Sequence, residues 1–140
     1  MKYMLLVYTD PTLLDELSPG EFDQSMKRCL DHADDLRQEG QLLDSQMLEP
    51  AATARSVRRR GGKTTTVDGP FAEAKEVLAG FNLIEADSME EAVRMAEEFP
   101  WVRTGCIEVR PVRDIGPVRR RVGAANASAP NGPDPSLRLG

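Results

Sequence analysis

Four side chains of this sequence have the types that acid–base chemistry or the binding of a small charged molecule requires. Asp68 lies in an Asp-Gly-Pro turn sequence, Glu73 and Lys75 follow it, and His32 is the only histidine. A carboxylate held at a strand end can act as a general base, and an imidazole titrates near neutral pH. Asp68 and His32 are therefore candidate catalytic residues. Lys75 and Glu73 are candidate ligand-binding residues, because a lysine neutralises an anion.

Each candidate also has a structural interpretation. An aspartate in such a turn often accepts hydrogen bonds from its own downstream backbone. Glu73 and Lys75 can form one solvated surface, and His32 falls at the edge of the apolar face of its predicted helix. Cys29 is interpreted as a small core residue; the alternative is a nucleophile that His32, three residues and about one helical turn later, activates.

The elements that must position these residues follow from the hydrophobic pattern. Short apolar runs predict strands at residues 2–9, 41–48, 77–86 and 104–112. Helical spacing predicts two helices, over 18–40 and over 88–99, and Leu30 is expected on the apolar face of the first. At the start of each helix, a serine and a glutamate three residues apart form a capping box. Two polar, β-branched runs around Gly61-Gly62, at 53–60 and 63–67, predict a hairpin.

The order β-α-β, hairpin, β-α-β predicts an α+β domain over residues 1–115. It is a ferredoxin-like split β-α-β repeat with an inserted β-hairpin and an antiparallel sheet. Both helices cover one face of this sheet, which leaves the other face uncovered and apolar. We expect a homodimer that buries these faces against each other. Residues 116–140 are expected to be a disordered tail, because large apolar side chains are almost absent after Arg121.

Charge and composition narrow the class of partner. The chain has 140 residues and a net charge of -5, which argues against a nucleic-acid binder. Two arginine runs, at 58–60 and 119–121, are local exceptions, the first interpreted as the decoration of an exposed hairpin. Aromatic residues make up only 5%, too few for base-stacking platforms.

The sequence also lacks the signatures of several large protein classes. Cys29 and Cys106 do not form a disulfide framework, so reduced thiols are expected. No apolar run has the length of a membrane span or of a signal peptide, so a cytoplasmic protein with no membrane partner is expected. Phosphate-binding loops, dinucleotide-binding glycine patterns and zinc-ligand spacings are missing, so we expect no cofactor and no metal site.

One stretch resembles a known family. Residues 67–73 (VDGPFAE), with Lys-Glu at 75–76, Gly-Phe at 80–81 and Ile-Glu-Ala at 84–86, resemble the signature of the DGPF proteins, a branch of the YCII-related superfamily. The opening residues 2–6 (KYMLL) and residues 107–112 (IEVRPV) look like the two ends of the same family domain. The resemblance covers about residues 1–113.

The resemblance implies a ferredoxin-like fold paired into a dimeric α+β barrel. Some YCII-related proteins look like lyase- or isomerase-type enzymes, with a histidine on the first helix and an aspartate as the proposed pair. In this sequence Asp68 matches the motif directly, whereas the histidine position falls near Cys29 and His32 lies about one turn later.

Two functions follow as hypotheses. The first is a small cofactor-independent enzyme that performs acid–base chemistry on a polar, anionic small molecule. The alternative is a non-catalytic ligand-binding or regulatory dimer, linked by the resemblance to sigma-factor regulation. Convergence of Asp68 and His32 on one pocket would favour the enzyme.

Overall fold

Over residues 1–125, the fold is an α+β arrangement of one antiparallel sheet, a separate hairpin and four helices. A computed structural model describes residues 1–125 of the chain. Its elements, in chain order, are β1 (Lys2–Thr9), α1 (Pro11–Asp15), α2 (Pro19–Gln38), β2 (Leu42–Met47), the 3₁₀ turn η1 (Ala51–Thr53), β3 (Arg55–Arg60), β4 (Lys63–Asp68), β5 (Val77–Glu85), α3 (Met89–Glu97), the 3₁₀ turn η2 (Pro100–Val102), β6 (Gly105–Pro111) and α4 (Gly116–Val122).

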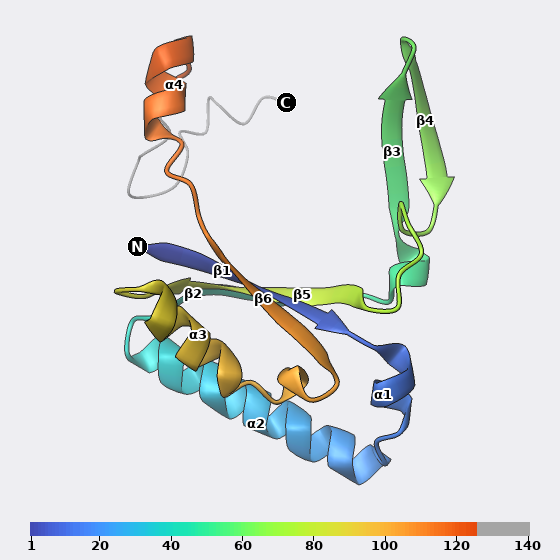
Figure 1. Cartoon of the computed structure of the whole chain (residues 1–140), viewed down its shortest axis with the longest axis vertical. Coiled ribbons are helices and arrows are strands. Elements are labelled where there is room, and N and C mark those ends of the chain that lie inside the picture. The colour runs from blue at the N-terminus through green and yellow to red at the C-terminus, as the bar shows by residue number, and fades with distance from the viewer. Residues whose placement is uncertain (126–140) are drawn as a thin grey trace.

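The main sheet has the strand order β2-β5-β1-β6, and every neighbouring pair is antiparallel. Helices α2 and α3 lie side by side on one face of this sheet, and the hairpin β3–β4 and helix α4 project from the other face (Figure 1). The hairpin forms its own two-stranded sheet, β3-β4. The main sheet therefore has one covered face and one open face.

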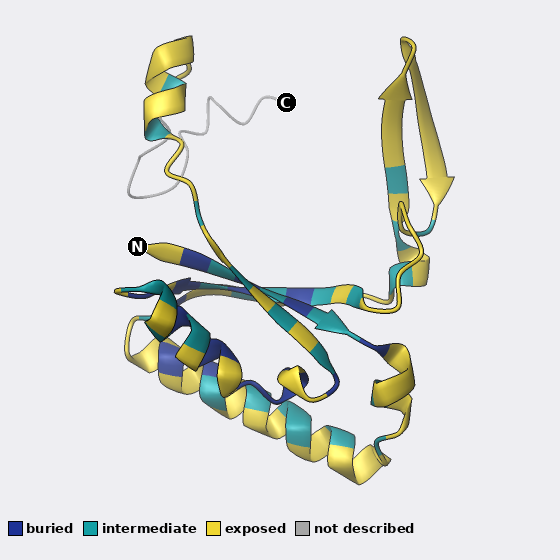
Figure 2. Cartoon of the chain, viewed as in Figure 1, coloured by how far each residue is buried: buried dark blue, intermediate teal, exposed yellow. Residues whose placement is uncertain are grey.

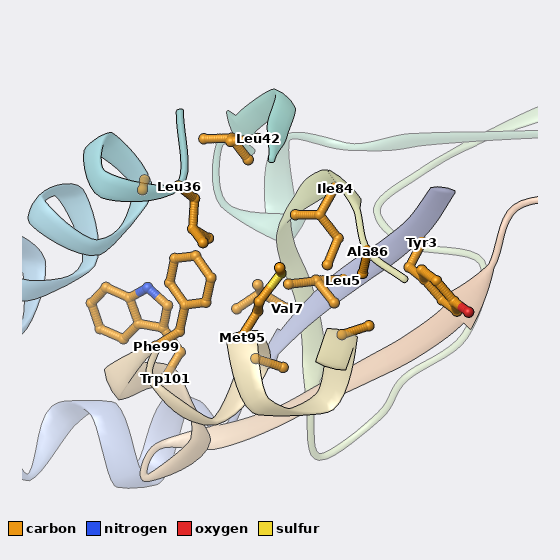
Figure 3. Packing of buried hydrophobic residues seen from close by; sticks show 13 residues of the cluster. Tyr3, Leu5, Val7, Leu36, Leu42, Ile84, Ala86, Met95, Phe99 and Trp101 are labelled. Atoms are coloured by element: carbon orange, nitrogen blue, oxygen red, sulfur yellow. The ribbon is translucent and has the colours of Figure 1, made fainter. Parts of the chain in front are cut away.

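The hydrophobic core lies between the sheet and the two long helices (Figure 3). Side chains alternate between the two faces along a strand, so every second residue of β1 points into this core. The fully buried Leu5, Ile84 and Phe99 lie at its centre. Around them pack the other buried apolar residues, namely Tyr3, Val7, Ala33, Leu36, Leu42, Ala86, Ala92, Met95, Ala96 and Trp101.

Local signals in the sequence account for where the elements begin and end. The Ser18 hydroxyl accepts from the Glu21 amide at 3.1 Å while the Glu21 carboxylate accepts from the Ser18 amide at 3.0 Å, so the predicted capping box is confirmed. Gly61 and Gly62 have φ values of +56° and +75°, which is the left-handed backbone that a tight hairpin turn needs.

Two expectations need correction. Leu30, expected on the apolar face of α2, is 53% exposed, because the core side of this helix is formed by Met26, Cys29, Ala33 and Leu36. The expected C-terminal tail starts with a helix, since Gly116–Val122 form α4; residues 126–140 of that tail lie outside the described residues. Within residues 1–125, the structure contains no helix with the length and apolar character of a membrane span.

Candidate functional site

A cavity of about 150 Å³ lies between the N-terminal half of α2 and the sheet, and we call it the α2 cleft. Six elements contribute to its lining, namely β1, α1, α2, β2, β5 and η2, so the lining comes from segments far apart in the sequence. The lining residues are Val7, Thr9, Leu14, Phe22, Met26, Cys29, Ser45, Gln46, Met47, Leu48, Ala79, Gly80, Phe81, Asn82 and Trp101.

Helix α2 forms one wall of the cleft because its two halves pack differently. Its apolar residues recur at helical spacing, but only Ala33 and Leu36, near the C-terminal end, are buried in the core. Phe22, Met26 and Cys29, nearer the N-terminal end, are partly buried and line the cavity. The apolar face of α2 thus packs into the core at its C-terminal end and lines an apolar cavity at its N-terminal end.

A polar pair lies in the otherwise apolar wall formed by the sheet. Ser45 on β2 and Asn82 on β5 are register partners, and the Ser45 hydroxyl donates to the Asn82 side-chain oxygen at 2.6 Å. Asn82 is only 6% exposed. Among residues 1–125, nothing accepts a hydrogen bond from the nitrogen of the Asn82 carboxamide, so this group is available to a molecule in the cleft.

Cys29 is the one lining residue of the α2 cleft with an acidic proton. Burial raises the pKa of its thiol, and a side-chain hydrogen bond with Trp101 lowers the pKa by a smaller amount. A buried thiol of raised pKa stays protonated at neutral pH, and the thiol is a far weaker nucleophile than the thiolate. These surroundings argue against a nucleophile, but Cys29 lines the cleft and is only partly buried, so it is not one of the buried core residues.

The lining of the α2 cleft contains no carboxylate, imidazole, ammonium or guanidinium group. General acid–base catalysis needs a group of matched pKa within hydrogen-bonding reach of the reacting atom. The cleft of a single chain has hydrogen-bonding groups that can orient a ligand, but no group that exchanges a proton with it near neutral pH. Within the described part of the chain, no cluster of three potential metal ligands occurs either.

His32 lies outside the α2 cleft, between α2 and α3. Its Nε2 is 2.9 Å from the Met95 carbonyl oxygen, and its ring packs edge-on against Phe99 with the ring centroids 4.4 Å apart. Its Nδ1 is 3.5 Å from a carboxylate oxygen of Glu98. These contacts join α2 to the C-terminal end of α3.

Asp68 lies at the end of β4 on the opposite side of the sheet from His32 (Figure 1). Its side chain is 91% exposed, and an oxygen of its carboxylate is 3.5 Å from Nε of Arg55 across the hairpin. The structure therefore does not bring Asp68 and His32 together. Glu73 is exposed in the following loop.

Lys75 contacts a carboxylate that sequence reasoning did not select. Its ammonium group is 3.7 Å from an oxygen of Asp10, whose side chain is only 6% exposed. Asp10 also caps α1 by accepting from the Thr12 amide at 3.0 Å. The Asp-Pro-Thr sequence at residues 10–12 carries that capping signal, with a proline at the first helical position. The ion pair between Lys75 and Asp10 thus links the loop after the hairpin to the residue that follows β1.

Comparison with known proteins agrees with this fold. The profile of the YCII-related domain matches residues 1–116. An uncharacterised protein of Rhizobium meliloti (strain 1021) is 34% identical over 114 residues, which is 80% of this chain and 92% of that protein. The match covers the sheet, α2, α3 and the hairpin. The chain belongs to the YCII-related family.

Proposed function

We propose that this protein is a non-catalytic, ligand-binding homodimer, and that the α2 cleft is its ligand site. The observation that supports the absence of catalysis is the lining of the cleft, which contains no group able to exchange a proton near neutral pH. The separation of His32 from Asp68 by the sheet favours the same function over the lyase- or isomerase-like alternative.

The proposed ligand is small, neutral and mainly apolar. An apolar cavity of about 150 Å³ holds one benzene-sized molecule. Phe22, Met26 and Trp101 provide apolar contact, and the free nitrogen of Asn82 donates to one acceptor on the ligand. The cleft lacks a cationic side chain, and an unpaired anion in an apolar site is costly, so a neutral ligand fits it better than an anionic one.

The ligand proposal can be tested by NMR titration, with phenol and benzyl alcohol as neutral probes and benzoate as a charged one. Trp101 is the single tryptophan of the chain, so its indole N–H signal is unambiguous, and the Asn82 side-chain amide reports the other wall. We expect the neutral probes to shift both signals and benzoate to bind at least about tenfold more weakly, because its charge loses hydration without gaining a partner.

Matched cysteine variants locate the bound probe. Cys29→Leu fills the cleft and should abolish the shifts, whereas Cys106→Leu makes the same change in β6 on the open face and should preserve them. Equal loss in both variants, or conversion of a bound probe into a new species in the NMR tube, would contradict a non-catalytic ligand site in the cleft.

The homodimer proposal is supported by the open face of the sheet. Apolar side chains occupy its centre on the two middle strands, and all are only partly buried in the single chain: Met4, Leu6, Tyr8, Phe81 and Leu83. Polar residues of the edge strands, such as Glu108 and Arg110 on β6, flank them. An apolar centre with a polar rim is typical of a protein–protein interface. We propose that two ferredoxin-like copies pack sheet to sheet into a dimeric α+β barrel.

Sedimentation equilibrium measures the homodimer directly. Leu6→Glu places a charge at the centre of the open face and should give a monomer at concentrations where the wild-type protein is a dimer. Leu13→Glu makes the same change on exposed α1, on the other side of the molecule, and should leave the dimer intact. A wild-type protein that is monomeric up to about 0.1 mM, far above the Kd of specific dimers, would contradict the proposal.

A further inference from the structure

The β3–β4 hairpin, residues 55–68, lacks the packing that would hold it in place, and we call it the arm. It projects from the open face of the sheet, and almost all of its surface is exposed (Figure 2). Val57 and Val67, one on each face of the arm, are 66% and 60% exposed. A two-stranded hairpin alone in water is only marginally stable, so contact with another surface would stabilise the arm.

The charge of the arm indicates the kind of surface. It carries five basic residues and one acidic residue, a net charge of +4, so the rest of the chain carries -9 of the total of -5. On one face Arg55 contacts Asp68, and Arg59 donates to Thr64 at 2.9 Å. Both cations of this face thus have a partner within the arm, so an acidic partner surface is needed mainly for the cations of the other face.

That other face carries three cations, Arg58, Arg60 and Lys63. Arg60 lies directly opposite Lys63 in the ladder, and like charges in that position destabilise a hairpin. Within residues 1–125, none of the three forms a salt bridge. An acidic partner surface would relieve this repulsion.

An acidic surface of this kind is present on the helical layer of the same protein. Helix α2 carries five acidic and three basic residues, and α3 carries three acidic and one basic, so the two helices together carry -4. The arm cannot reach this layer in its own chain, because it projects from the opposite face of the sheet (Figure 1). A second copy offers the same layer to it.

The length of the arm fits that contact in a sheet-to-sheet dimer. Six residues per strand at about 3.3 Å each give an arm of about 20 Å. Stacked sheets lie about 10 Å apart, and a helix with its side chains is about 10–12 Å thick. An arm rising from one sheet therefore passes the level of the partner sheet and ends at the level of the partner's helices.

We propose that the arm of each copy lies against the acidic α2–α3 layer of the other copy, so that the two arms make reciprocal contacts across the dimer. This inference rests on the proposed homodimer and adds a second, charged contact to its apolar one. Two-fold symmetry forms the contact twice in each dimer.

The base of the arm favours a second protein copy over a nucleic acid as the occupant. A hollow of about 590 Å³ separates the base of the arm from the open face, and it is lined mainly by apolar residues, among them Tyr8, Leu78, Pro70 and Phe71. Phe71 is 77% exposed. The apolar surface of the open face is thus continuous with the arm, whereas the charge of -9 on the rest of the chain would repel a nucleic acid.

The test compares two triple variants with the same net charge. The arm variant is Arg58→Gln, Arg60→Gln and Lys63→Gln. The control variant is Arg28→Gln, Arg37→Gln and Arg94→Gln, which removes three cations from the helical layer instead. Sedimentation equilibrium gives the dimer Kd of each at about 0.01 M and about 1 M salt, where the Debye length is about 30 Å and about 3 Å.

We expect the arm variant to raise the dimer Kd at least about tenfold at low salt and by less than about threefold at high salt, because salt screens exposed pairs. The control variant should leave the Kd unchanged or lower it, since it makes the proposed docking surface more acidic. Hydrogen exchange of the arm amides should be slower in the dimer than after dilution to the monomer.

Three outcomes would overturn the inference. A dimer whose Kd responds equally to both triple variants would show an effect of net charge alone and would leave the sheet-to-sheet dimer standing. A monomeric wild-type protein would refute the homodimer together with the arm contact. Binding of a duplex oligonucleotide that the arm variant loses, with its dimer Kd unchanged, would assign the arm to nucleic acid instead.

Discussion

Replacement of His32 by alanine tests whether the single histidine is a structural residue. The imidazole Nε2 donates to the Met95 carbonyl at 2.9 Å, and the ring packs edge-on against Phe99. Met95 is in the last turn of α3, where carbonyl groups have no partner within the helix. His32→Ala removes the donor and the ring together, and so leaves that carbonyl without its side-chain partner.

The loss can be estimated from these two contacts. A hydrogen bond of this kind contributes about 0.5–1.5 kcal/mol, and an edge-to-face ring pair contributes about as much again. The His32 side chain is only 11% exposed, so its removal also leaves a gap between the helices. We expect His32→Ala to lower the free energy of unfolding by about 2–3 kcal/mol, which lowers Tm by about 10 °C in a domain of this size.

Urea unfolding followed by circular dichroism and by Trp101 fluorescence measures this loss. His32→Gln keeps an N–H donor at a similar reach but removes the ring, so it should recover roughly half of the loss. Glu98→Gln is the matched control, because its carboxylate is 73% exposed and surface pairs contribute little; it should cost less than about 0.5 kcal/mol.

One result would refute the structural role of His32. If His32→Ala unfolds like the wild-type protein but no longer shifts the Trp101 signal with the neutral probes, then the imidazole acts on the ligand and not on the helices. Probe binding that survives in the folded variant, together with the expected loss of stability, would support the assignment.

Further predictions concern a close backbone contact and the two thiols. Gly105→Ala should strongly destabilise the fold or prevent folding in a thermal-unfolding assay, because a Cβ at this position would lie 1.9 Å from the Tyr8 carbonyl oxygen, and strand backbone cannot move aside. Gly20→Ala is the control: a Cβ there would have no atom within 4 Å, so this change should be neutral or slightly stabilising in the same assay. In the folded Leu6→Glu monomer, iodoacetamide should alkylate Cys106, which is exposed in the single chain, well before Cys29, as read by mass spectrometry of peptides, and comparable rates would contradict the burial of Cys29. Because folding raises the pKa of Cys29, the thiol ionises at a lower pH in the unfolded chain than in the folded one. The free energy of unfolding should therefore fall as the pH rises through about 9.0, the ordinary pKa, in the wild-type protein, and this fall should be absent in Cys29→Ala.

Residues close together in the chain are enough to predict the four strands of the main sheet, the hairpin and helices α2 and α3, whereas the sequence pattern does not predict α1 and α4. The apolar runs predicted β1, β2, β5 and β6 to within one residue at each end. Ser18 with Glu21 predicted the start of α2, and Gly61 with Gly62 predicted the hairpin turn, since each motif satisfies backbone geometry locally.

The candidate site depended on contacts between distant segments. Ser45 and Asn82 meet only through the β2–β5 register, and Trp101 reaches the cleft from the turn after α3. No local pattern marks a serine or an asparagine in a strand as a cleft residue.

The tertiary structure also decided which of the ionisable candidates could act together. Asp68 and His32 are both plausible acid–base residues in the sequence, but the hairpin and the helices lie on opposite faces of the sheet. The pattern of residues 53–67 predicts the hairpin but not the face of the sheet from which it projects. The signature around Asp68 is a local pattern and identifies the family, whereas the α2 cleft, assembled from six separate elements, is visible only in the folded chain.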